Sequence, residues 1–480
     1  MSLSLLSFFS QCLSVLGSAI TPLVLLLSTS EKSQVFFLER TKKHWLSQIQ
    51  NALDEFEKSA QNLKQNSQRP VYWVHVASAG ELEQIIPVLR SLHERCKVVF
   101  FVTYFSPSAK PFLKNCPGVL TATSLPWEDK KLFVHAIQRL QIKRLILVRY
   151  DFWPAFISAF QSSSVPICVL AATLQKARSP LPLGVQKKLR AFWLTLCDAI
   201  FLVHAKERKT LIAEGLLPEK IFVAGDAKWH RAKERAALVK AKSLSKAIQT
   251  LAQAMTFARS QSSDQFGYPV VVFGSPHQEE LQVLEKVLRK SIMHQSRRCF
   301  FVVAPHEVDE KTLSGIENRL QIGNTRLFRL SQSESPQWRE SLQNTKESTI
   351  ILLDSFGYLA EAYGIADLAV IGGGFDGQLH NVLEPAAIPV ATLFGNRATR
   401  ASEAQTLLTG NAALGFTSPE MLFQFLDRWV TLSEGDAEFG NMFRTLANLR
   451  KNAESLFSSL PDTSEVVCQA LASKDALEIS

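Results

Sequence analysis

The sequence lacks the short motifs that identify several common kinds of catalytic and metal site. It has no Walker A loop, no His-Glu-x-x-His pair and no Gly-x-Ser-x-Gly elbow. Its seven cysteines are scattered and form no C-x-x-C pair, which argues against a zinc site and against a disulfide framework. This cysteine usage fits a reducing compartment. We therefore expect no bound metal and no cofactor.

Nucleic-acid-binding signatures are also absent, although the chain is basic. Lysine and arginine outnumber aspartate and glutamate by 53 to 44, for a net charge of +9. A basic balance suits nucleic acid, an anionic membrane surface or an acidic substrate. Without zinc-finger spacing, an RNA-binding signature or an arginine-rich tail, nucleic acid is not the expected partner. A chain of 480 residues, 46% of them apolar, predicts two domains with additional segments.

Charge is missing altogether from residues 1–30. Leu3 to Leu27 is largely apolar and, at about 1.5 Å per residue, is long enough to cross a bilayer core of roughly 30 Å. Arg40, Lys42 and Lys43 follow, so the rest of the chain is expected on the cytoplasmic face. A cleaved signal peptide is disfavoured because no basic residue precedes the apolar run. We expect one N-terminal membrane anchor; a helix lying in the membrane interface is the alternative.

From residue 71 onward the sequence alternates between β-like and helical segments, the rhythm of a doubly wound parallel sheet. The expected strands are 71–76, 98–103, 144–148, 167–171, 199–203, 221–224, 270–273, 299–303, 326–330, 350–353, 368–371 and 390–394. Ligands of such sheets bind beyond the carboxyl ends of the strands, so a cleft between two such halves is the expected site. The predicted divisions are an anchor at 1–30, an N-terminal Rossmann-like domain at 31–230, a helical connector without strands at 231–268, and a C-terminal Rossmann-like domain at 269–480.

The most informative segment is Leu368 to Pro385. An apolar strand leads into Gly372 to Gly374, and a helix is predicted to begin near Asn381. A strand, a glycine loop and a helix start present backbone N–H groups and the positive end of a helix to an anion. Asn381 and Glu384 share one helix face, where the carboxylate can hold sugar hydroxyls. This pattern suggests a nucleotide-sugar site, and an ordinary turn that uses glycine for its backbone freedom is the alternative.

Polar groups also follow other predicted strands. Glu81, at a helix start, could take a proton from a hydroxyl or simply complement the helix dipole. Asp151 could cap the next helix or contribute to the site, and Lys228 could neutralise a phosphate or remain a solvated lysine. His306 could contact a ligand or be an ordinary loop histidine. Two further polar loops, Gly274 to Glu279 and Asp354 to Tyr358, also follow predicted strands. Together with the glycine loop these make seven loops at successive strand ends, and they indicate group transfer from a nucleotide sugar without an obligatory metal.

In order and spacing, these segments resemble the 3-deoxy-D-manno-octulosonic acid (Kdo) transferases, membrane-anchored glycosyltransferases of lipopolysaccharide synthesis. The resemblance runs from the N-terminus to about residue 416. The segments that carry it are Phe37-Leu38-Glu39-Arg40 with Trp45, Ser78-Ala79-Gly80-Glu81, Phe105-Ser106-Pro107-Ser108, Tyr150-Asp151-Phe152-Trp153, Gly225-Asp226, Ala304-Pro305-His306-Glu307, Gly372-Gly373-Gly374-Phe375, and His380-Asn381 with Leu383-Glu384.

The resemblance implies the GT-B fold, two facing Rossmann-like domains. It also implies inverting transfer of Kdo from the donor CMP-Kdo to a lipid A precursor (lipid IVA) at the inner membrane, with membrane lipid as a partner. Glu81 matches the family's catalytic base, and Asp151 and Lys228 match positions thought to stabilise the transition state. The implied donor-binding residues are Ala304, Pro305, His306, Phe356, Gly357, Tyr358, Gly373, Gly374, Asn381, Val382, Leu383 and Glu384.

Two positions depart from the commoner family pattern. Asp151 stands where glutamate is common, which shortens the reach of the carboxylate. Ala304-Pro305 stands where the family commonly has Pro-Arg, whose arginine contacts the CMP phosphate. A subgroup of the family shares the Pro-His-Glu form, so His306 is a candidate substitute. A GT-B transferase that uses a UDP-sugar, or a non-catalytic lipid- or nucleotide-binding relative, are the alternative functions.

Overall fold

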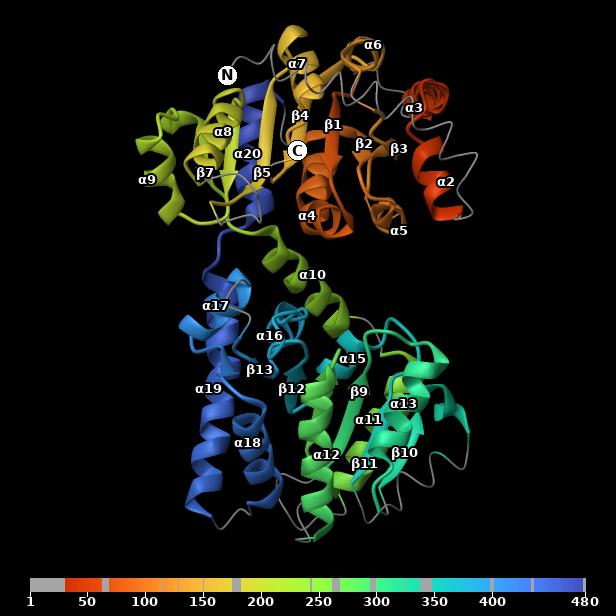
Figure 1. The fold of residues 1–480 in the computed structure, drawn as a ribbon, viewed down its shortest axis with the longest axis vertical. Helices are drawn as coiled ribbons and strands as arrows, with labels where there is room; N and C mark the ends of the chain where they lie inside the picture. Colours follow the sequence, from red (N-terminus) through yellow and green to blue (C-terminus); the bar gives the residue numbers. More distant parts are fainter. Residues whose placement is uncertain are drawn as a thin grey trace. The chain divides into compact units, whose positions relative to one another are not determined.

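The computed structural model describes residues 31–62, 69–114, 116–127, 129–149, 151–174, 183–241, 244–260, 268–293, 299–323, 325–335, 338, 348–397, 401–432 and 436–477. These residues form two compact units. The N-terminal unit contains the described residues up to Arg231 together with those from Pro461 onward, and the C-terminal unit is Ala232–Leu460. In each unit a twisted sheet has helices on both faces (Figure 1).

The sheet of the N-terminal unit has seven strands in the order β3-β2-β1-β4-β5-β6-β7. Neighbouring strands of this sheet pair in parallel. Because the chain moves outward from β1 in one direction and then returns to β4, the order of connections reverses between β1 and β4. The strands are β1 (Val71–Val76), β2 (Val99–Tyr104), β3 (Val119–Ser124), β4 (Ile142–Val148), β5 (Ile167–Ala172), β6 (Ala199–Leu202) and β7 (Ile221–Val223).

Helices cover both faces of this sheet because its strands are apolar on both sides. β1, β2 and β5 are buried along their whole length, and two separate apolar clusters form, one on each face. The described helices of this unit are α2 (Glu31–Leu38), α3 (Lys42–Asn62), α4 (Ala79–Cys96), α5 (Lys110–Leu113), α6 (Lys130–Arg139), α7 (Pro154–Ser162), α8 (Leu183–Thr195), α9 (Lys206–Ala213) and α20 (Thr463–Asp475), with 3-10 turns η1 (Pro107–Ala109) and η2 (Pro218–Lys220).

The C-terminal helix α20 packs against α4 of the N-terminal unit. This differs from the predicted division, which assigned residues 269–480 to one C-terminal domain. The physical reason is an apolar face: Val467, Cys468 and Leu471 are fully buried in the cluster that α4 helps to build. In addition, Asp475 accepts hydrogen bonds from the buried Arg144, with Nε at 2.8 Å.

The sheet of the C-terminal unit also has seven parallel strands, in the order β10-β11-β9-β8-β12-β13-β14. The order of connections reverses between β8 and β12. The strands are β8 (Val270–Gly274), β9 (Phe300–Ala304), β10 (Arg326–Arg329), β11 (Thr349–Leu352), β12 (Leu368–Ile371), β13 (Ala391–Gly395) and β14 (Ala413–Phe416).

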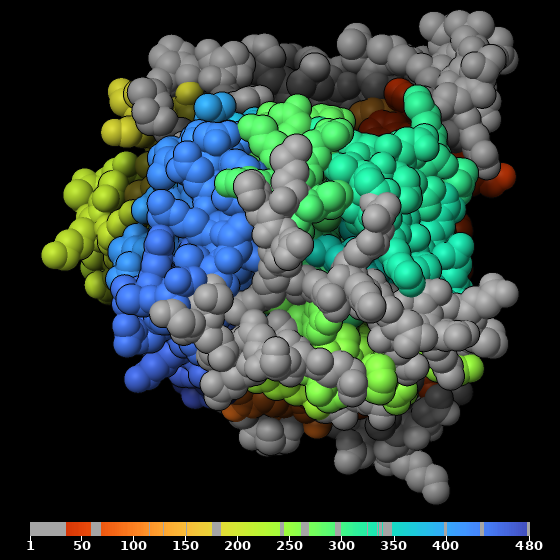
Figure 2. All heavy atoms as spheres, turned by 90° about the horizontal axis from the view of Figure 1, so that it is seen from below, coloured from red at the N-terminus to blue at the C-terminus, as the bar shows by residue number. Residues whose placement is uncertain are grey.

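The predicted connector at 231–268 is part of this second unit rather than a separate segment. It consists of most of α10 (Ala227–Ala241), which begins in the N-terminal unit, and of α11 (Lys246–Ser260). The other described helices are α12 (Gln278–Met293), α13 (Glu310–Leu320), α15 (Leu359–Gly364), α16 (Leu383–Ala387), α17 (Ser402–Thr409), α18 (Pro419–Thr431) and α19 (Ala437–Ser459), with the 3-10 turn η3 (Leu330–Glu334). In Figure 2 the face of α12 (green) lies between the helices α18 and α19 (blue) and the segment 299–330 (blue-green).

The predicted membrane anchor at residues 1–30 lies outside the described residues. Among the helices of the described ranges, none combines the length and the apolar character needed to cross a bilayer.

Candidate functional site

The predicted base, Glu81, lies in the first turn of α4, directly after β1. Its Oε2 accepts a hydrogen bond from the backbone N–H of Ala77 at 2.6 Å. Burial raises the pKa of the Glu81 carboxyl, and the Ala77 hydrogen bond and the charge of Arg149 act in the opposite direction. A carboxylate whose pKa is raised is a better proton acceptor near neutral pH than an ordinary glutamate.

Asp151 follows β4, the strand next to β1 on the other side of the reversal. It does not cap α7, whose N-cap residue is Trp153 and has no side-chain cap bond. Instead its Oδ2 lies 3.0 Å from Nε2 of the fully buried His75. Because a carboxylate can only accept, we assign the imidazole proton to Nε2. Asp151 is therefore held at the same strand edge as Glu81, and its negative charge contributes to the raised pKa of Glu81.

A buried chain of hydrogen bonds holds the His75 ring through its other nitrogen, Nδ1. Its Nδ1 lies 2.9 Å from the hydroxyl of Thr103, which also accepts from Nε1 of Trp73 at 2.9 Å. These side chains project from adjacent strands, β1 and β2, on one face of the sheet. Sequence reasoning missed His75, although a histidine inside the otherwise apolar strand 71–76 was the available signal, because buried polar groups require partners.

Lys228 lies in the first turn of α10, and its backbone N–H donates to Oδ1 of Asp226 at 3.0 Å. The same oxygen accepts from Nε2 of Gln84 at 2.6 Å. Gln84 is three residues after Glu81, so both lie on one face of α4. The structure therefore brings the loops of Glu81, Asp151 and Lys228 together at one edge of the N-terminal sheet.

In the C-terminal unit the glycine triplet follows β12, at the reversal between β8 and β12. Each glycine has a packing reason: an added Cβ would lie 1.9 Å from the Ser275 oxygen at Gly372, 2.3 Å from the Gln378 oxygen at Gly373, and 2.4 Å from the Gly395 oxygen at Gly374. Gly373 also has a positive φ of 76°. Close packing and backbone conformation therefore account for these glycines, the alternative that the sequence left open.

One backbone donor of this loop is engaged inside the protein, since the N–H of Gly372 donates to the Gly274 oxygen at 3.0 Å. Glu280, on the neighbouring loop, is 1% exposed, and burial raises its pKa. Its Oε2 accepts from the His277 N–H at 2.9 Å. The Gly372 N–H is therefore not a free donor for an anion, and anion binding by the rest of the glycine loop stays a prediction.

The predicted helix start near Asn381 is also displaced. α16 begins at Leu383 and is five residues long. Oδ1 of Asn381 accepts from the Leu383 N–H at 3.0 Å, so Asn381 caps this short helix, while Val382 stands at the N-cap position. The Glu384 carboxylate forms an ion pair with Arg235 of α10. A contact of Glu384 with a ribose stays a prediction.

Three histidines gather beside the glycine loop. Nε2 of His277 lies 2.9 Å from Nε2 of His380, and Nδ1 of His277 lies 2.6 Å from Oδ2 of Asp376. The rings of His306 and His380 are 4.8 Å apart. Burial lowers the pKa of His380, and the two neighbouring histidines lower it further. Within the described residues, no group of three or more His, Cys, Asp or Glu side chains has an arrangement that could hold a metal ion.

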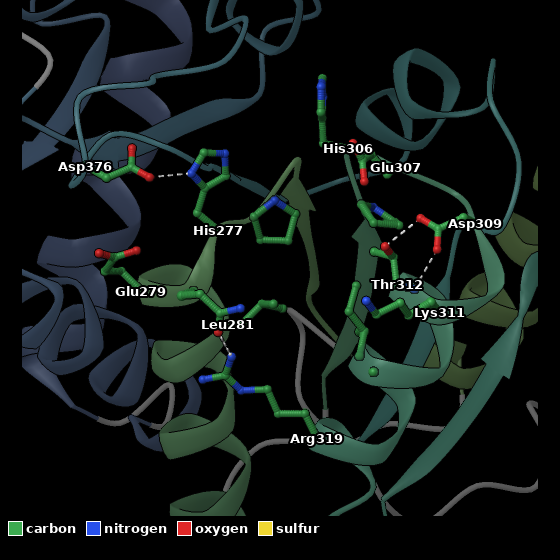
Figure 3. A pocket seen from close by; sticks show the side chains of 15 residues that line it. His277, Glu279, Leu281, His306, Glu307, Asp309, Lys311, Thr312, Arg319 and Asp376 are labelled. Carbon is green, nitrogen blue, oxygen red and sulfur yellow. Dashed lines mark hydrogen bonds and ion pairs between the residues drawn. The ribbon is translucent and has the colours of Figure 1, made fainter. Parts of the chain in front are cut away.

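Two of these histidines, His277 and His306, line a cavity of about 1020 Å³ at the carboxyl ends of β8 and β9. Of the predicted donor residues, Pro305 and His306 line it. Figure 3 shows Asp376 and His277 pointing toward each other on one side, and Asp309, Lys311 and Arg319 on or near α13 on the other. The ionisable side chains at its wall are those of His277, Glu279, His306, Glu307, Asp309, Lys311, Arg319 and Asp376.

The other predicted donor residues are not among those that line this cavity. Ala304 is the buried end of β9. Phe356, Gly357 and Tyr358 form the loop between β11 and α15, where Phe356 is 73% exposed and Gly357 has a φ of 103°. An exposed aromatic ring beside a strand end is available to a flat ligand. His277, His380 and Asp376 belong to the arrangement but were not among the predicted donor residues. His277 and Asp376 are 99 positions apart, so the sequence alone does not show that they meet.

Comparison with known proteins supports one family. Residues 53–231 match the family model "3-Deoxy-D-manno-octulosonic-acid transferase (kdotransferase)". The chain is 23% identical over 325 residues to the 3-deoxy-D-manno-octulosonic acid transferase of Aquifex aeolicus, covering 67% of this chain and 75% of the relative. It is 23% identical over 362 residues to that of Chlamydia pneumoniae, covering 72% and 74%.

A third relative is the bifunctional glycosyltransferase/methyltransferase of Fusobacterium nucleatum, 22% identical over 334 residues, with 67% of this chain and 47% of that protein covered. The chain thus spans about half of that longer protein.

Solved structures show the same fold. A UDP-GlcNAc 2-epimerase from Neisseria meningitidis matches with a TM-score of 0.53 at 12% identity, covering 84% of this chain and all of that one. A glycosyltransferase from Rickettsia africae matches with a TM-score of 0.50 at 11% identity, covering 85% and 98%. Two parallel α/β units of this kind are the GT-B architecture expected from the sequence. The family match over residues 53–231 and the relatives above therefore make this chain similar to the Kdo transferases, a family of glycosyltransferases.

Proposed function

We propose that this protein transfers Kdo from CMP-Kdo to the sugar hydroxyl of a lipid A precursor, with inversion at the anomeric carbon. The observation that carries the proposal is Glu81, a partly buried carboxylate with a raised pKa at the β1–β4 reversal of the domain that matches the family. In this role Glu81 removes the proton of the acceptor hydroxyl as its oxygen bonds to the Kdo anomeric carbon. The bond from that carbon to the CMP phosphate breaks, and CMP leaves as an anion.

The other groups of the N-terminal unit support the base. Asp151 is held by His75, and its negative charge favours the protonated form of Glu81 after transfer. Lys228, at a helix start, is assigned to stabilise negative charge that develops as CMP leaves. Removal of one such electrostatic contact in other enzymes costs about 10²–10³ in rate.

The C-terminal unit is proposed to bind the nucleotide donor. The histidine cluster with His306 takes the place of the arginine that the commoner family form uses at the phosphate. A histidine pair can donate N–H groups to phosphate oxygens, and its charge increases as the pH falls. The exposed ring of Phe356 offers a stacking surface for the base. We propose the cytoplasmic face of the inner membrane for this reaction, because the proposed acceptor is a lipid and the uncharged, apolar sequence of residues 1–30 is followed by Arg40, Lys42 and Lys43.

The test is the mass of the product. Purified full-length protein is incubated with CMP-Kdo and a tetraacylated lipid A precursor, and the lipid is analysed by mass spectrometry. Addition of one or more Kdo masses supports the proposal and counts the units transferred. An unchanged lipid, with thermal stabilisation by UDP but not by CMP, would instead indicate a UDP-sugar transferase.

A further inference from the structure

The side chain of Arg40 is 2% exposed although it carries a guanidinium group. It lies directly after α2, and its Nη1 donates to the backbone oxygen of Phe36 at 2.7 Å, a carbonyl of the last turn of that helix. The guanidinium carbon lies 3.6 Å from the centre of the Phe36 ring and 5.0 Å from that of Phe105. Burial lowers the pKa of Arg40 to about 10, so the group stays charged at neutral pH.

The second acceptor of Arg40 belongs to another part of the unit. Its Nη2 donates to the backbone oxygen of Phe105, the first residue after β2. The neighbouring Glu39 holds the same region, because its carboxylate pairs with Lys110 and accepts from the Ser124 hydroxyl at 2.7 Å. Two consecutive charged side chains at the end of α2 therefore hold the loop that follows β2.

This loop is in turn bonded to the backbone that carries Glu81. The N–H of Ser106 donates to the Ala77 oxygen at 2.8 Å, and the N–H of Ala79 donates to Oγ of Ser108 at 3.3 Å. The N–H of the same Ala77 is the donor to the Glu81 carboxylate. The ring of Phe105 also stacks on Trp153, two residues after Asp151, with centroids 5.5 Å apart. The loop thus contacts the segments of both acidic residues.

We propose that Arg40 is a positioning residue for the transfer reaction: by holding the Phe105 carbonyl it fixes the loop Phe105–Ser108, which fixes the Ala77–Ala79 backbone and with it the Glu81 carboxylate. The role rests on the proposed function, since it requires Glu81 to be the base. In this role the end of the short helix α2 does more than pack on the unit, because it sets the geometry of the strand edge that carries Glu81.

The test compares Arg40→Ala, Arg40→Lys and Ser108→Ala in the full-length protein, with Kdo transfer measured from pH 5 to 9. For Arg40→Ala we expect kcat to fall by about 10²-fold, the size of effect that a 1 Å misplacement produces, with KM for CMP-Kdo unchanged. The acid limb of the pH profile should move to higher pH, because weakening the Ala77–Glu81 bond removes a contact that lowers the Glu81 pKa. Arg40→Lys retains one donor group and should restore part of the rate. Ser108→Ala should shift the acid limb of the pH profile in the same direction, but by less.

Arg190→Ala is the matched control, since Arg190 is a partly buried arginine of the same unit that pairs with Glu214 at 2.9 Å between α8 and α9. It should leave the pH profile unchanged. If Arg40→Ala does not fold, as judged by circular dichroism, the shift with Ser108→Ala decides. A wild-type pH profile in the folded Arg40 variant, or in Ser108→Ala when the Arg40 variant is unfolded, overturns the positioning role. Wild-type protein that transfers no Kdo overturns the proposed function instead, and the positioning role with it.

Discussion

The two units have the same framework but carry opposite chemistry at the same place. Each has a seven-stranded parallel sheet whose connections reverse direction between two central strands. At that point the N-terminal unit has carboxylates, Glu81 and Asp151, with a buried histidine behind them. The C-terminal unit has glycines and a cluster of histidines, and the carboxylate of Glu280 is buried there. One framework can therefore provide a proton acceptor or a site that tolerates an anionic nucleotide, depending on a few residues after two strands.

The units also differ in how they are completed. The C-terminal unit is one continuous segment, whereas the N-terminal unit needs α20 from the far end of the chain. The acidic strand edge therefore depends on a long-range contact, because α20 packs on α4, the helix whose first turn carries Glu81.

The largest expected effect comes from removing the proton acceptor. Glu81→Gln keeps the side-chain volume and the Ala77 contact but cannot accept a proton, so kcat should fall by about 10²–10⁴-fold. Asp151→Asn should cause a smaller loss because it acts through charge. Steady-state Kdo transfer measures both. Near-full activity of Glu81→Gln would show that the acidic edge is not the proton acceptor and would remove the chemical contrast between the units.

The second prediction concerns the dependence of the N-terminal unit on α20. Asp475→Ala leaves the guanidinium of Arg144, which is 1% exposed, paired with the carboxylate of Asp198 but without that of Asp475. Loss of one partner of a buried ion pair costs about 3–5 kcal/mol. Urea denaturation monitored by tryptophan fluorescence measures the change. Glu55→Gln, in the exposed pair with Lys58, is the control and should change stability by less than about 0.5 kcal/mol.

The third prediction is that close packing in the C-terminal unit requires glycine at position 374. Gly374→Ala places a Cβ 2.4 Å from the Gly395 oxygen and should destabilise by about 1–3 kcal/mol. Gly440→Ala, in α19 with nothing within 4 Å, should instead stabilise by about 0.5–1 kcal/mol. Thermal unfolding distinguishes them. If Gly374→Ala is as stable as wild type yet loses CMP binding, the glycine serves the ligand rather than the fold.

The smallest expected effect is a pH dependence of stability that arises in the C-terminal unit. Because the pKa of His380 in the folded protein lies below its ordinary value of 6.5, protons bind the unfolded state more tightly. The contribution of neutral His380 to the free energy of unfolding is fully present above pH 6.5 and decreases as the pH falls toward the lowered pKa. His380→Asn should reduce this loss by less than about 1 kcal/mol, since the ring is only partly buried. Denaturation at pH 7 and pH 5 measures it; equal loss in wild type and variant would contradict the prediction.

Much of the fold could be predicted because the strands are uniform apolar runs. The segments 71–76, 270–273 and 368–371 were each expected as strands and are β1, β8 and β12. The edge strands β3 and β14 were not predicted, because 119–124 contains threonine and serine and 413–416 contains a glycine. Edge strands need less burial, so their sequences lack the apolar signal.

The sequence by itself determined that two α/β units exist, that Glu81 and Asp151 follow strands of the first, and that a glycine loop follows a strand of the second. Local patterns suffice for this, because periodicity and turn residues are properties of neighbouring positions. Only the tertiary structure decided that α20 belongs to the first unit, that His75 holds Asp151, that Asp376 lies beside His277, and that Arg40 reaches the loop beside Glu81. Those contacts join residues far apart in the chain, and their partners are set by how the strands are ordered in the sheet.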